Sequence, residues 1–386
     1  MEENYDLITG IAAEAPEHPQ RIEVRDFAPW HKPRKQYIRG NQWIKEITTF
    51  LDANDLEGRP FKYFSLPGDD MIDLCMLAEE CQRLGVQLRV LGFNEDLQEP
   101  IGEEDILKVI SRSEISAKIA PGSYIRPDDF KDLSNSNSMA SNYVCKFGSF
   151  DVINLDFCDS IFNRDYQAKH DALHKLITNQ IQNRTRPWLL FLTTRSDTTE
   201  DLGHYWKSIY ENFDRDPRFI ENFRVVFEFS SLINNDGLKI NPKLISNISN
   251  HNFTKLFGIG FSKWILNMLM FEQPYFIVEM LDSYWYRVDN EDPNMLSLAY
   301  RISRHPEVKE DPSGLVPSEI PDDPDEYRCA LRIMNKVHHI KDLDQIVDED
   351  DDLFNGLTDE TKQFLSPVRY RLEDYPAWAN QKRIRF

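Results

Sequence analysis

Glycine is scarce in this sequence: 15 glycines occur in 386 residues, and none belongs to a phosphate-binding motif. The spacing G-x-G-x-x-G, which opens a dinucleotide-binding fold, is absent, and so is the phosphate loop G-x-x-x-x-G-K-[ST]. These absences exclude the common ways of holding a diphosphate against the start of a helix. A nucleotide-like ligand would have to be bound by other chemistry.

Paired cysteines and long apolar stretches are also missing. The five cysteines form no C-x-x-C pair, so neither a disulfide framework nor a zinc ribbon is indicated, and we expect no metal site. The longest apolar stretch, residues 264–271, is far shorter than the roughly 20 residues that cross a bilayer. The acidic N-terminus lacks the apolar core of a signal peptide. We therefore expect a soluble, cytoplasmic protein without a membrane partner.

Positive charge is in short supply, since 45 lysines and arginines face 65 acids and the net charge is −20. This balance argues against non-specific binding of a polyanion, which requires neutralising cations. Residues 21–45 differ: they interleave aromatic side chains with cations, a combination that can stack bases and pair phosphates. We therefore expect Trp30, Arg34 and Lys35 to contact a nucleic-acid substrate. The alternative is that these cations pair with acids of the same chain.

Three apolar runs each end in a short, acid-rich turn, over residues 62–73, 87–96 and 150–159. In an open parallel sheet, ligands bind outside the carboxyl ends of the strands, so these acids are expected to line one pocket. The first run is typical of a strand, a turn at Pro67 and Gly68, and a helix. Two aspartates follow the glycine, and they would repel a diphosphate but accept an ammonium or sulfonium group.

This order of segments resembles the class I S-adenosylmethionine-dependent methyltransferases over residues 45–303. The resemblance implies an α/β fold with a Rossmann-like, mostly parallel sheet, helices on both faces and a C-terminal antiparallel hairpin, here within residues 284–302. It also implies S-adenosylmethionine as the cofactor, with Glu95 or Asp96 on the ribose. The expected cofactor contacts are Ser65, Pro67, Gly68, Asp69, Asp73, Asn94, Glu95, Asp96, Asp128 and Asp129.

Asn154 and Asp156 alternate along the strand expected over residues 150–156, so both face the expected pocket. A carboxylate there can accept a hydrogen bond from an acceptor nitrogen or oxygen that loses its proton, which makes Asp156, with Asn154, the catalytic candidate. Phe157 would offer a stacking face to the substrate. The alternative role of Asp156 is to cap the following helix.

The sequence is expected to divide into three parts. Residues 1–44 form an N-terminal arm with the basic-aromatic segment, residues 45–303 the Rossmann-like domain, and residues 304–386 a proline-rich, acidic linker with a small helical appendage that docks a protein partner.

Two functions are compatible with these features. The strand-end acids favour a methyltransferase acting on nucleic acid or a nucleotide. The single-glycine turn favours a methyltransferase-like protein without turnover, acting as an adaptor or subunit of a larger assembly, for example in nucleic-acid processing or defence.

Overall fold

The computed structural model describes residues 24–110, 119–161, 165–196, 217–226, 249–270, 274–288, 294–305, 313, 325–367 and 369–384. Several sequence-based expectations lie outside this part of the chain. These are the arm over residues 1–23, the hairpin turn over residues 289–293 and, apart from residue 313, the linker over residues 306–324. None of the described helices is both long and apolar enough to cross a membrane.

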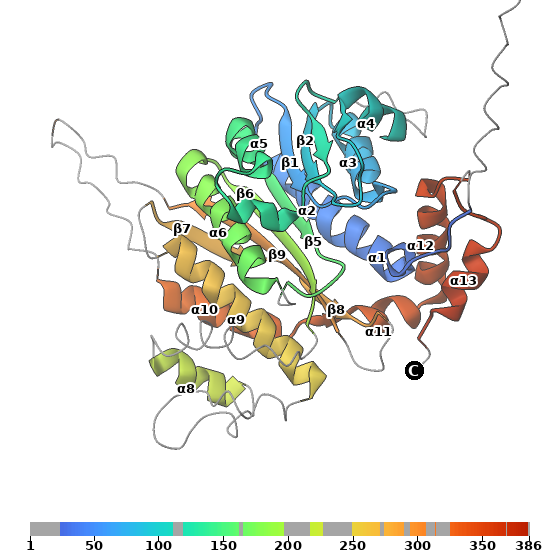
Figure 1. The fold of residues 1–386 in the computed structure, drawn as a ribbon. Helices are drawn as coiled ribbons and strands as arrows, with labels where there is room; N and C mark the ends of the chain where they lie inside the picture. Colours follow the sequence, from blue (N-terminus) through green and yellow to red (C-terminus); the bar gives the residue numbers. More distant parts are fainter. Residues whose placement is uncertain are drawn as a thin grey trace, which may run out of the picture.

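A mixed, mostly parallel sheet of ten strands forms the centre of the described chain (Figure 1). Its order is β10-β8-β9-β6-β5-β1-β2-β4-β3, with β7 paired to β9. Strands β6, β5, β1, β2 and β4 run parallel, whereas β9 is antiparallel to β6, β7 and β8. The expected C-terminal antiparallel pairing is therefore confirmed. The strands are β1 Phe61–Ser65, β2 Leu88–Phe93, β3 Ile101–Gly102, β4 Tyr124–Arg126, β5 Val152–Asp156, β6 Trp188–Arg195, β7 Phe276–Met280, β8 Tyr284–Tyr286, β9 Met295–Arg304 and β10 Lys341–Asp342.

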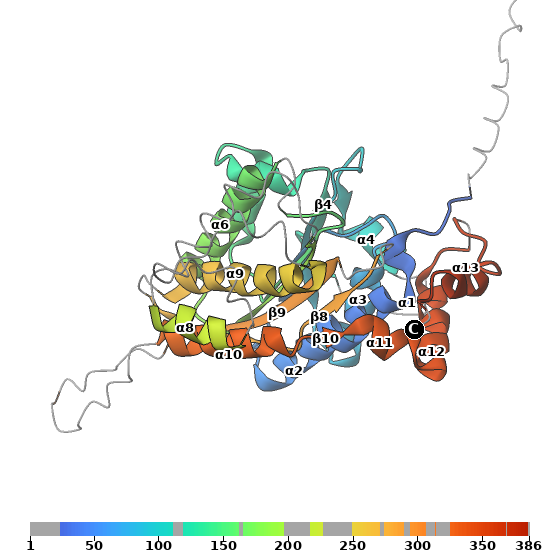
Figure 2. The same cartoon turned by 90° about the horizontal axis from the view of Figure 1, so that it is seen from below.

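Helices cover both faces of this sheet (Figures 1 and 2). The described helices are η1 Pro29–His31, α1 Pro33–Tyr37, η2 Ile38–Ile44, α2 Lys45–Ala53, α3 Ile72–Arg83, α4 Glu103–Ile110, η3 Phe130–Ser134, α5 Met139–Phe147, α6 Tyr166–Asn183, α8 Pro217–Val226, α9 Asn250–Met270, α10 Glu326–His338, α11 Leu343–Asp348, α12 Asp351–Phe364 and α13 Tyr375–Gln381. The fold is thus α/β and Rossmann-like, as the sequence predicts.

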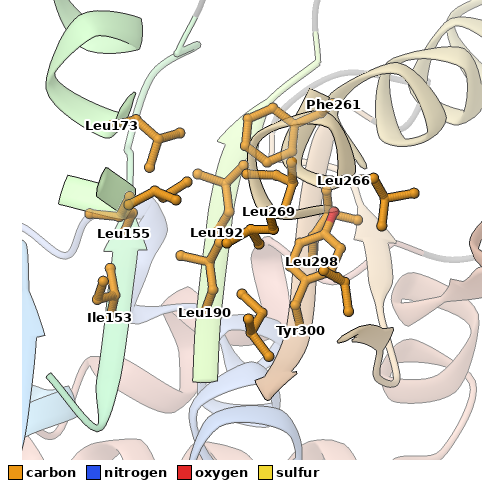
Figure 3. Close-up of a cluster of buried hydrophobic side chains, with 14 of the residues drawn as sticks. Ile153, Leu155, Leu173, Leu190, Leu192, Phe261, Leu266, Leu269, Leu298 and Tyr300 are labelled. Atoms are coloured by element: carbon orange, nitrogen blue, oxygen red, sulfur yellow. The ribbon is translucent and has the colours of Figure 1, made fainter. Parts of the chain in front are cut away.

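Two hydrophobic clusters, one on each face, explain why the central strands are apolar throughout. Leu190 and Leu192 of β6 pack in the first cluster with Leu298 of β9 and with α9 (Figure 3). Leu189 and Phe191, at the alternating positions, belong to the second cluster, which includes residues of η2, α2 and α3. A parallel strand covered on both sides needs apolar side chains at every position. The continuous apolar run over 188–192 meets this requirement.

The strand order reverses between β1 and β5. From β1 the chain proceeds outward to β2 and β4, and it then returns to β5 on the opposite side of β1. Open α/β sheets bind ligands at the carboxyl ends of the strands where the order reverses. Ser65, the last residue of β1, is the register partner of Asn154 on β5. Two residues named from the sequence therefore lie next to each other at this position.

The C-terminal residues do not form the separate appendage that composition suggests. Strand β10 pairs with β8 in the main sheet. Val337 of α10 lies close to Gly258 of α9, where an added Cβ would be 3.4 Å from Val337 Cγ1. Phe354 and Tyr375 join the second cluster with residues of η2 and α3. These helices bury their apolar faces on the rest of the protein, and the proline-rich segment before them carries no signal of that packing.

Candidate functional site at the carboxyl ends of the strands

The turn after β1 closes against β2. Pro67 is buried, and a Cβ added to Gly92 of β2 would approach its Cγ and Cδ to 3.0 Å. Gly68 is exposed and has open space around its Cα. Met71 adopts a left-handed conformation (φ 49°) directly before α3 begins. The predicted strand, turn and helix are confirmed, and the proline ring covers the backbone of the second strand.

The polar side chains after β1, β2 and β4 meet at one edge of the sheet, as the sequence predicts. Asn94 Nδ2 donates a hydrogen bond to Asp69 Oδ1 over 3.4 Å. A hydrogen bond with Asp129 raises the pKa of Glu95, because the proton that joins the two carboxyl groups is retained. Asp96 is exposed. The expected ribose and adenine contacts therefore form a connected group.

Three carboxylates of this edge are paired with cations of the same chain. The distances are 2.6 Å for Arg25 to Asp69, 2.7 Å for Arg126 to Asp128 and 2.9 Å for Lys131 to Asp129. Ion pairs of this kind are partly exposed and can exchange with a ligand at modest cost. A cofactor bound along this edge would have to open them.

The N-terminal segment, residues 24–44, lies across the carboxyl ends of β1 and β5. His31 Nδ1 accepts a hydrogen bond from the backbone N–H of Ala28, so His31 Nε2 carries the proton and donates it to Asp70 Oδ2 over 3.2 Å. Lys35 Nζ lies 2.5 Å from Asp156 Oδ1. This segment therefore contacts an acid that follows β1 and the acid that ends β5.

C-terminal elements hold the N-terminal segment in place. Arg34 pairs with Asp344 of α11 over 2.9 Å and with Asp348 over 2.7 Å. Tyr375 Oη donates to the carbonyl of His31 over 2.5 Å. In Figures 1 and 2, α1 lies beside α11 and α12. The N-terminal segment is thus packed between the sheet and the C-terminal helices.

Asp70 is the centre of a small buried network. Tyr370 Oη donates to Asp70 Oδ2 over 2.6 Å, in addition to the bond from His31. Burial alone would raise the pKa of Asp70, but the hydrogen bonds from His31 and Tyr370 lower it below its ordinary value. Burial lowers the pKa of His31, although Asp70 opposes this effect. The network contains an ionised carboxylate and a neutral imidazole at neutral pH.

These contacts correct the expectation that Arg34 and Lys35 belong to an exposed basic strip that contacts nucleic acid. Arg34 and Lys35 are buried, with 3% and 5% of their surface exposed, and both pair with carboxylates of the same chain. Burial lowers the pKa of Lys35, and the charge of Asp156 opposes that shift. Their sequence pattern resembled an exposed basic strip because acids more than a hundred residues away supply the partners. Trp30 remains 43% exposed.

A group of polar side chains lies where the strand order reverses; we call it the buried polar cluster and define it as Arg39, Ser65, Asp73, Asn154 and Asp156. Arg39, Ser65 and Asn154 are buried, and the two aspartates are half-buried. Arg39 comes from η2, a π-helix, which is a rare conformation that is frequent at functional sites. Its Nε and Nη1 atoms, Ser65 Oγ and Asn154 Oδ1 are buried without a hydrogen-bond partner among the described residues. Such groups are rare in folded proteins and require an explanation.

Electrostatic contacts link the members of this cluster. Burial raises the pKa of Asp73 to about 6, the charge of Arg39 opposes that rise and the charge of Asp156 adds to it. Asn154 Nδ2 donates to Tyr63 Oη over 2.8 Å, which orients its oxygen. Carboxylates and a guanidinium group therefore lie together at the reversal, an arrangement that suits a ligand carrying both signs of charge.

A pocket of about 230 Å³ opens beside the cluster, over the carboxyl ends of β5 and β6. Its walls come from the N-terminal segment, from the residues after β5, from the end of β6, and from β8, β9 and the residues that follow β8. The lining residues are Pro29, Trp30, Lys32, Arg34, Lys35, Asp156, Phe157, Cys158, Arg195, Tyr286, Arg287, Val288 and Met295.

The pocket divides the sequence-predicted residues into two groups. Asp156 and all four expected substrate contacts line it, whereas Asn154 lies behind it in the buried polar cluster. None of the ten expected cofactor contacts lines it. Sequence reasoning missed Lys32, Arg195 and Tyr286. Lys32 and Arg195 carried a usable signal, because Lys32 belongs to the basic-aromatic segment and Arg195 ends the strand next to β5.

Cys158 lines the pocket but lacks the properties of a nucleophile. Burial raises the pKa of its thiol to about 11, and the charge of Asp156 adds to this effect. The thiolate is the reactive form, so this side chain is protonated at neutral pH.

Comparison of the sequence with curated proteins finds no match. Residues 24–380 match the PP_RS20740-like family, and this range includes the N-terminal segment, the sheet and the C-terminal helices. The chain belongs to the PP_RS20740-like family.

Proposed function

We propose that this protein binds a small molecule at the reversal between β1 and β5 and catalyses S-adenosylmethionine-dependent methyl transfer. The observation that carries the proposal is the buried polar cluster. Ser65 and Asn154 present unpartnered oxygens at the tips of the two strands, and Arg39 presents an unpartnered guanidinium edge beside Asp73. The amino-acid end of the cofactor carries an ammonium and a carboxylate, so it needs acids and a cation in one place.

The residues present fit the amino-acid end of S-adenosylmethionine well, but they fit its adenosine end only in part. The contacts proposed for the ribose and adenine, Glu95, Asp128 and Asp129, have protein partners in this conformation. Pro67 also covers Gly92 between the tips of β1 and β2. Binding of the adenosine end would therefore require the pairs at this edge to open, which ion pairs near the surface permit at small cost.

Asp156 is the side chain proposed to handle the proton. It belongs to the buried polar cluster and also lines the pocket, so it lies between the proposed cofactor end and an acceptor. S-adenosylmethionine would supply a methyl group that is already activated by its sulfonium. The acceptor's N–H or O–H proton would pass to Asp156, and Lys35 at 2.5 Å would hold that carboxylate in place.

A second function is favoured by a different observation. The N-terminal segment covers the strand ends with internal ion pairs, from Arg25 at Asp69 to Lys35 at Asp156. A protein that kept the fold without turnover, and served as an adaptor or subunit, would tolerate such a cover permanently. The two functions differ in whether the cover admits a ligand.

Calorimetry on the full-length protein distinguishes them. We expect S-adenosylmethionine and its demethylated product to bind, and Arg39→Gln to weaken both by about tenfold or more, since it removes a charged hydrogen-bonding group. Arg83→Gln, which removes an exposed arginine of α3, is the matched control and should leave binding unchanged. Absence of binding to either compound, in protein shown to be folded, would reject the enzyme and leave the adaptor.

A further inference from the structure

We infer that the pocket beside Asp156 binds an uncharged planar ring with an amide-like edge, on which an N–H and a C=O lie side by side. Asp156 accepts a hydrogen bond from the N–H, and Tyr286 donates one to the C=O. In calling this ligand the methyl acceptor, the inference rests on the proposed function; the chemistry of the pocket stands independently of it. Hydrogen bonding, charge and ring contacts each restrict the ligand.

One oxygen of Asp156 is available to a ligand. Its Oδ1 accepts the hydrogen bond from Lys35 over 2.5 Å, whereas Oδ2 accepts none from the residues that the structure describes. Oδ2 is not among the buried unpartnered atoms of these residues, and 23% of the Asp156 side chain is exposed at the pocket wall. A carboxylate oxygen forms hydrogen bonds roughly twice as strong as those between neutral groups. The ligand therefore presents an N–H or O–H donor at this point.

The hydroxyl group of Tyr286 offers the complementary hydrogen bond. Tyr286 ends β8 and lines the pocket, and its Oη forms no hydrogen bond with the described part of the chain. Burial and the charge of Asp156 both raise the pKa of Tyr286 above its ordinary value, so the phenol keeps its proton. Because the charge of Asp156 acts on this hydroxyl group, the two side chains are neighbours. A donor beside an acceptor matches the C=O and N–H of an amide edge.

The ion pairs of the wall favour an uncharged ligand. Arg34, Lys35 and Arg287 each pair with a carboxylate of the same chain. An anionic group beside Asp156 would face its carboxylate, and a cationic group would face the ammonium group of Lys35, only 2.5 Å from that carboxylate. Removing a charged group from water costs far more free energy than removing a neutral amide. The ion pair of Lys35 and Asp156 therefore suits a polar edge without net charge.

Aromatic side chains provide surfaces on which a ring can pack. Trp30 of the N-terminal segment lines the pocket and is 43% exposed, although most tryptophans are largely buried. Phe157, directly after β5, belongs to the same lining. Flat rings pack favourably on aromatic faces. The pocket volume of about 230 Å³ is below the ~300–1,000 Å³ of pockets that hold drug-sized ligands, so it suits a single ring.

NMR titration of the full chain tests this inference without any cofactor. The four probes have similar sizes: benzamide carries both groups, acetophenone lacks the N–H, benzoate is charged, and cyclohexanecarboxamide lacks the planar ring. We expect benzamide to bind most tightly of the four. Its advantage over acetophenone should be about tenfold, the contribution of a hydrogen bond to a charged group.

Tyr286→Phe removes the hydroxyl group and keeps the ring, so it should weaken benzamide binding about fivefold, as loss of a neutral hydrogen bond does. Tyr124→Phe is the matched control, because it removes a hydroxyl group from an exposed tyrosine on β4 that is not part of the pocket wall. Trp30→Leu removes an aromatic face and should weaken benzamide more than cyclohexanecarboxamide.

Three results would overturn the inference. They are acetophenone binding as tightly as benzamide, benzoate binding as tightly as benzamide, and equal affinities for benzamide in Tyr286→Phe and Tyr124→Phe. Benzamide binding without S-adenosylmethionine binding would reject the proposed function alone. Binding of S-adenosylmethionine without binding of benzamide would reject this inference alone.

Discussion

Lys35 and Asp156, which are 121 positions apart in the sequence, form an ion pair of 2.5 Å that joins the N-terminal segment to the end of β5. Lys35 is buried, and Asp156 borders the pocket with 23% of its side chain exposed. Because Asp156 belongs to the buried polar cluster and both residues line the pocket, the pair lies where the cluster meets the pocket. It also shows how a cation of the basic segment can be buried in this acidic protein: a carboxylate from a distant strand pairs with it.

Breaking this pair should affect stability asymmetrically. Asp156→Asn leaves the buried Lys35 cation unpaired and should lower the free energy of unfolding by about 3 kcal/mol. Lys35→Met leaves a carboxylate that reaches solvent and should cost about 1 kcal/mol. The double variant should recover most of the larger loss. Urea denaturation of the four proteins measures the coupling, and additive losses would show that the two side chains do not interact.

The carboxyl group of Asp73 should make stability depend on pH. Its pKa is raised to about 6, so between about pH 4 and pH 6 the folded protein holds a proton that the unfolded chain has released. The free energy of unfolding should therefore fall as pH rises through this window. Asp344, whose pKa burial also raises to about 6, should contribute to the same fall. Asp73→Asn should therefore reduce the fall, and it should stabilise the protein at pH 8 by on the order of 2 kcal/mol, with little effect near pH 4.

Denaturation at pH 4.5 and pH 8 measures the effect of Asp73→Asn. Asp105→Asn provides the control, because Asp105 lies on the exposed surface of α4. A loss of stability in Asp73→Asn at pH 8 would contradict the assignment, since it would mean that the charged form is favoured in the fold.

Gly92 should tolerate no side chain. An added Cβ would lie 3.0 Å from two carbons of the buried Pro67 ring, so Gly92→Ala must displace the turn after β1. Overpacking of this kind costs about 1–3 kcal/mol, and the melting temperature should fall accordingly. Gly102→Ala, at a position with no atom within 4 Å, should be close to neutral. Similar melting temperatures for both variants would show that Pro67 can move freely.

Tyr370 should control how firmly the N-terminal segment is held. Tyr370→Phe removes the hydrogen bond to Asp70, and a bond to a charged group contributes about 1.5–3 kcal/mol. We expect faster hydrogen exchange in residues 24–44, measured by mass spectrometry. Tyr124→Phe removes a hydroxyl group from an exposed tyrosine on β4 and should leave this exchange unchanged. If hydrogen exchange in residues 24–44 is unchanged in Tyr370→Phe, the contacts of Arg34 and Tyr375 are what keep the N-terminal segment in place.

Cys158 should react slowly with alkylating agents although its side chain reaches the surface, as that of Cys145 does. With a pKa of about 11, only about 0.1% of the Cys158 thiol is ionised at pH 8, so its alkylation should be slower than that of Cys145. Its rate should increase about tenfold per pH unit up to pH 10, because the thiolate fraction does. Peptide mass spectrometry measures both cysteines, and alkylation of Cys158 ahead of Cys145 would contradict its raised pKa.

Much of the sheet was predictable from local sequence. The apolar run over 188–192 predicts a covered parallel strand, and the turn at Pro67 and Gly68 predicts a strand-to-helix turn. The acids after β1, β2 and β4 could be assigned to one edge because parallel strands end on the same side. These features depend on side-chain periodicity and turn chemistry within a few residues.

The site was predictable only in part. Asp156, Phe157 and Trp30 were named from the sequence and line the pocket, whereas Lys32 and Tyr286 were not. The sequence also did not show which acids pair with the cations of the basic segment. Arg34 pairs with Asp348, which is 314 positions away, and no local pattern links two such residues.

The sequence by itself determined the central parallel strands, the acid-rich turns that follow them and the edge where polar groups gather, since these follow from backbone geometry and local periodicity. Only the tertiary structure decided that the basic segment turns inward, that the C-terminal helices hold it, and that a pocket forms between them. The physical reason is that charge pairing and enclosure depend on which distant surfaces pack together. Which surfaces pack together is decided by the burial of the two hydrophobic clusters, each of which gathers residues from distant parts of the chain.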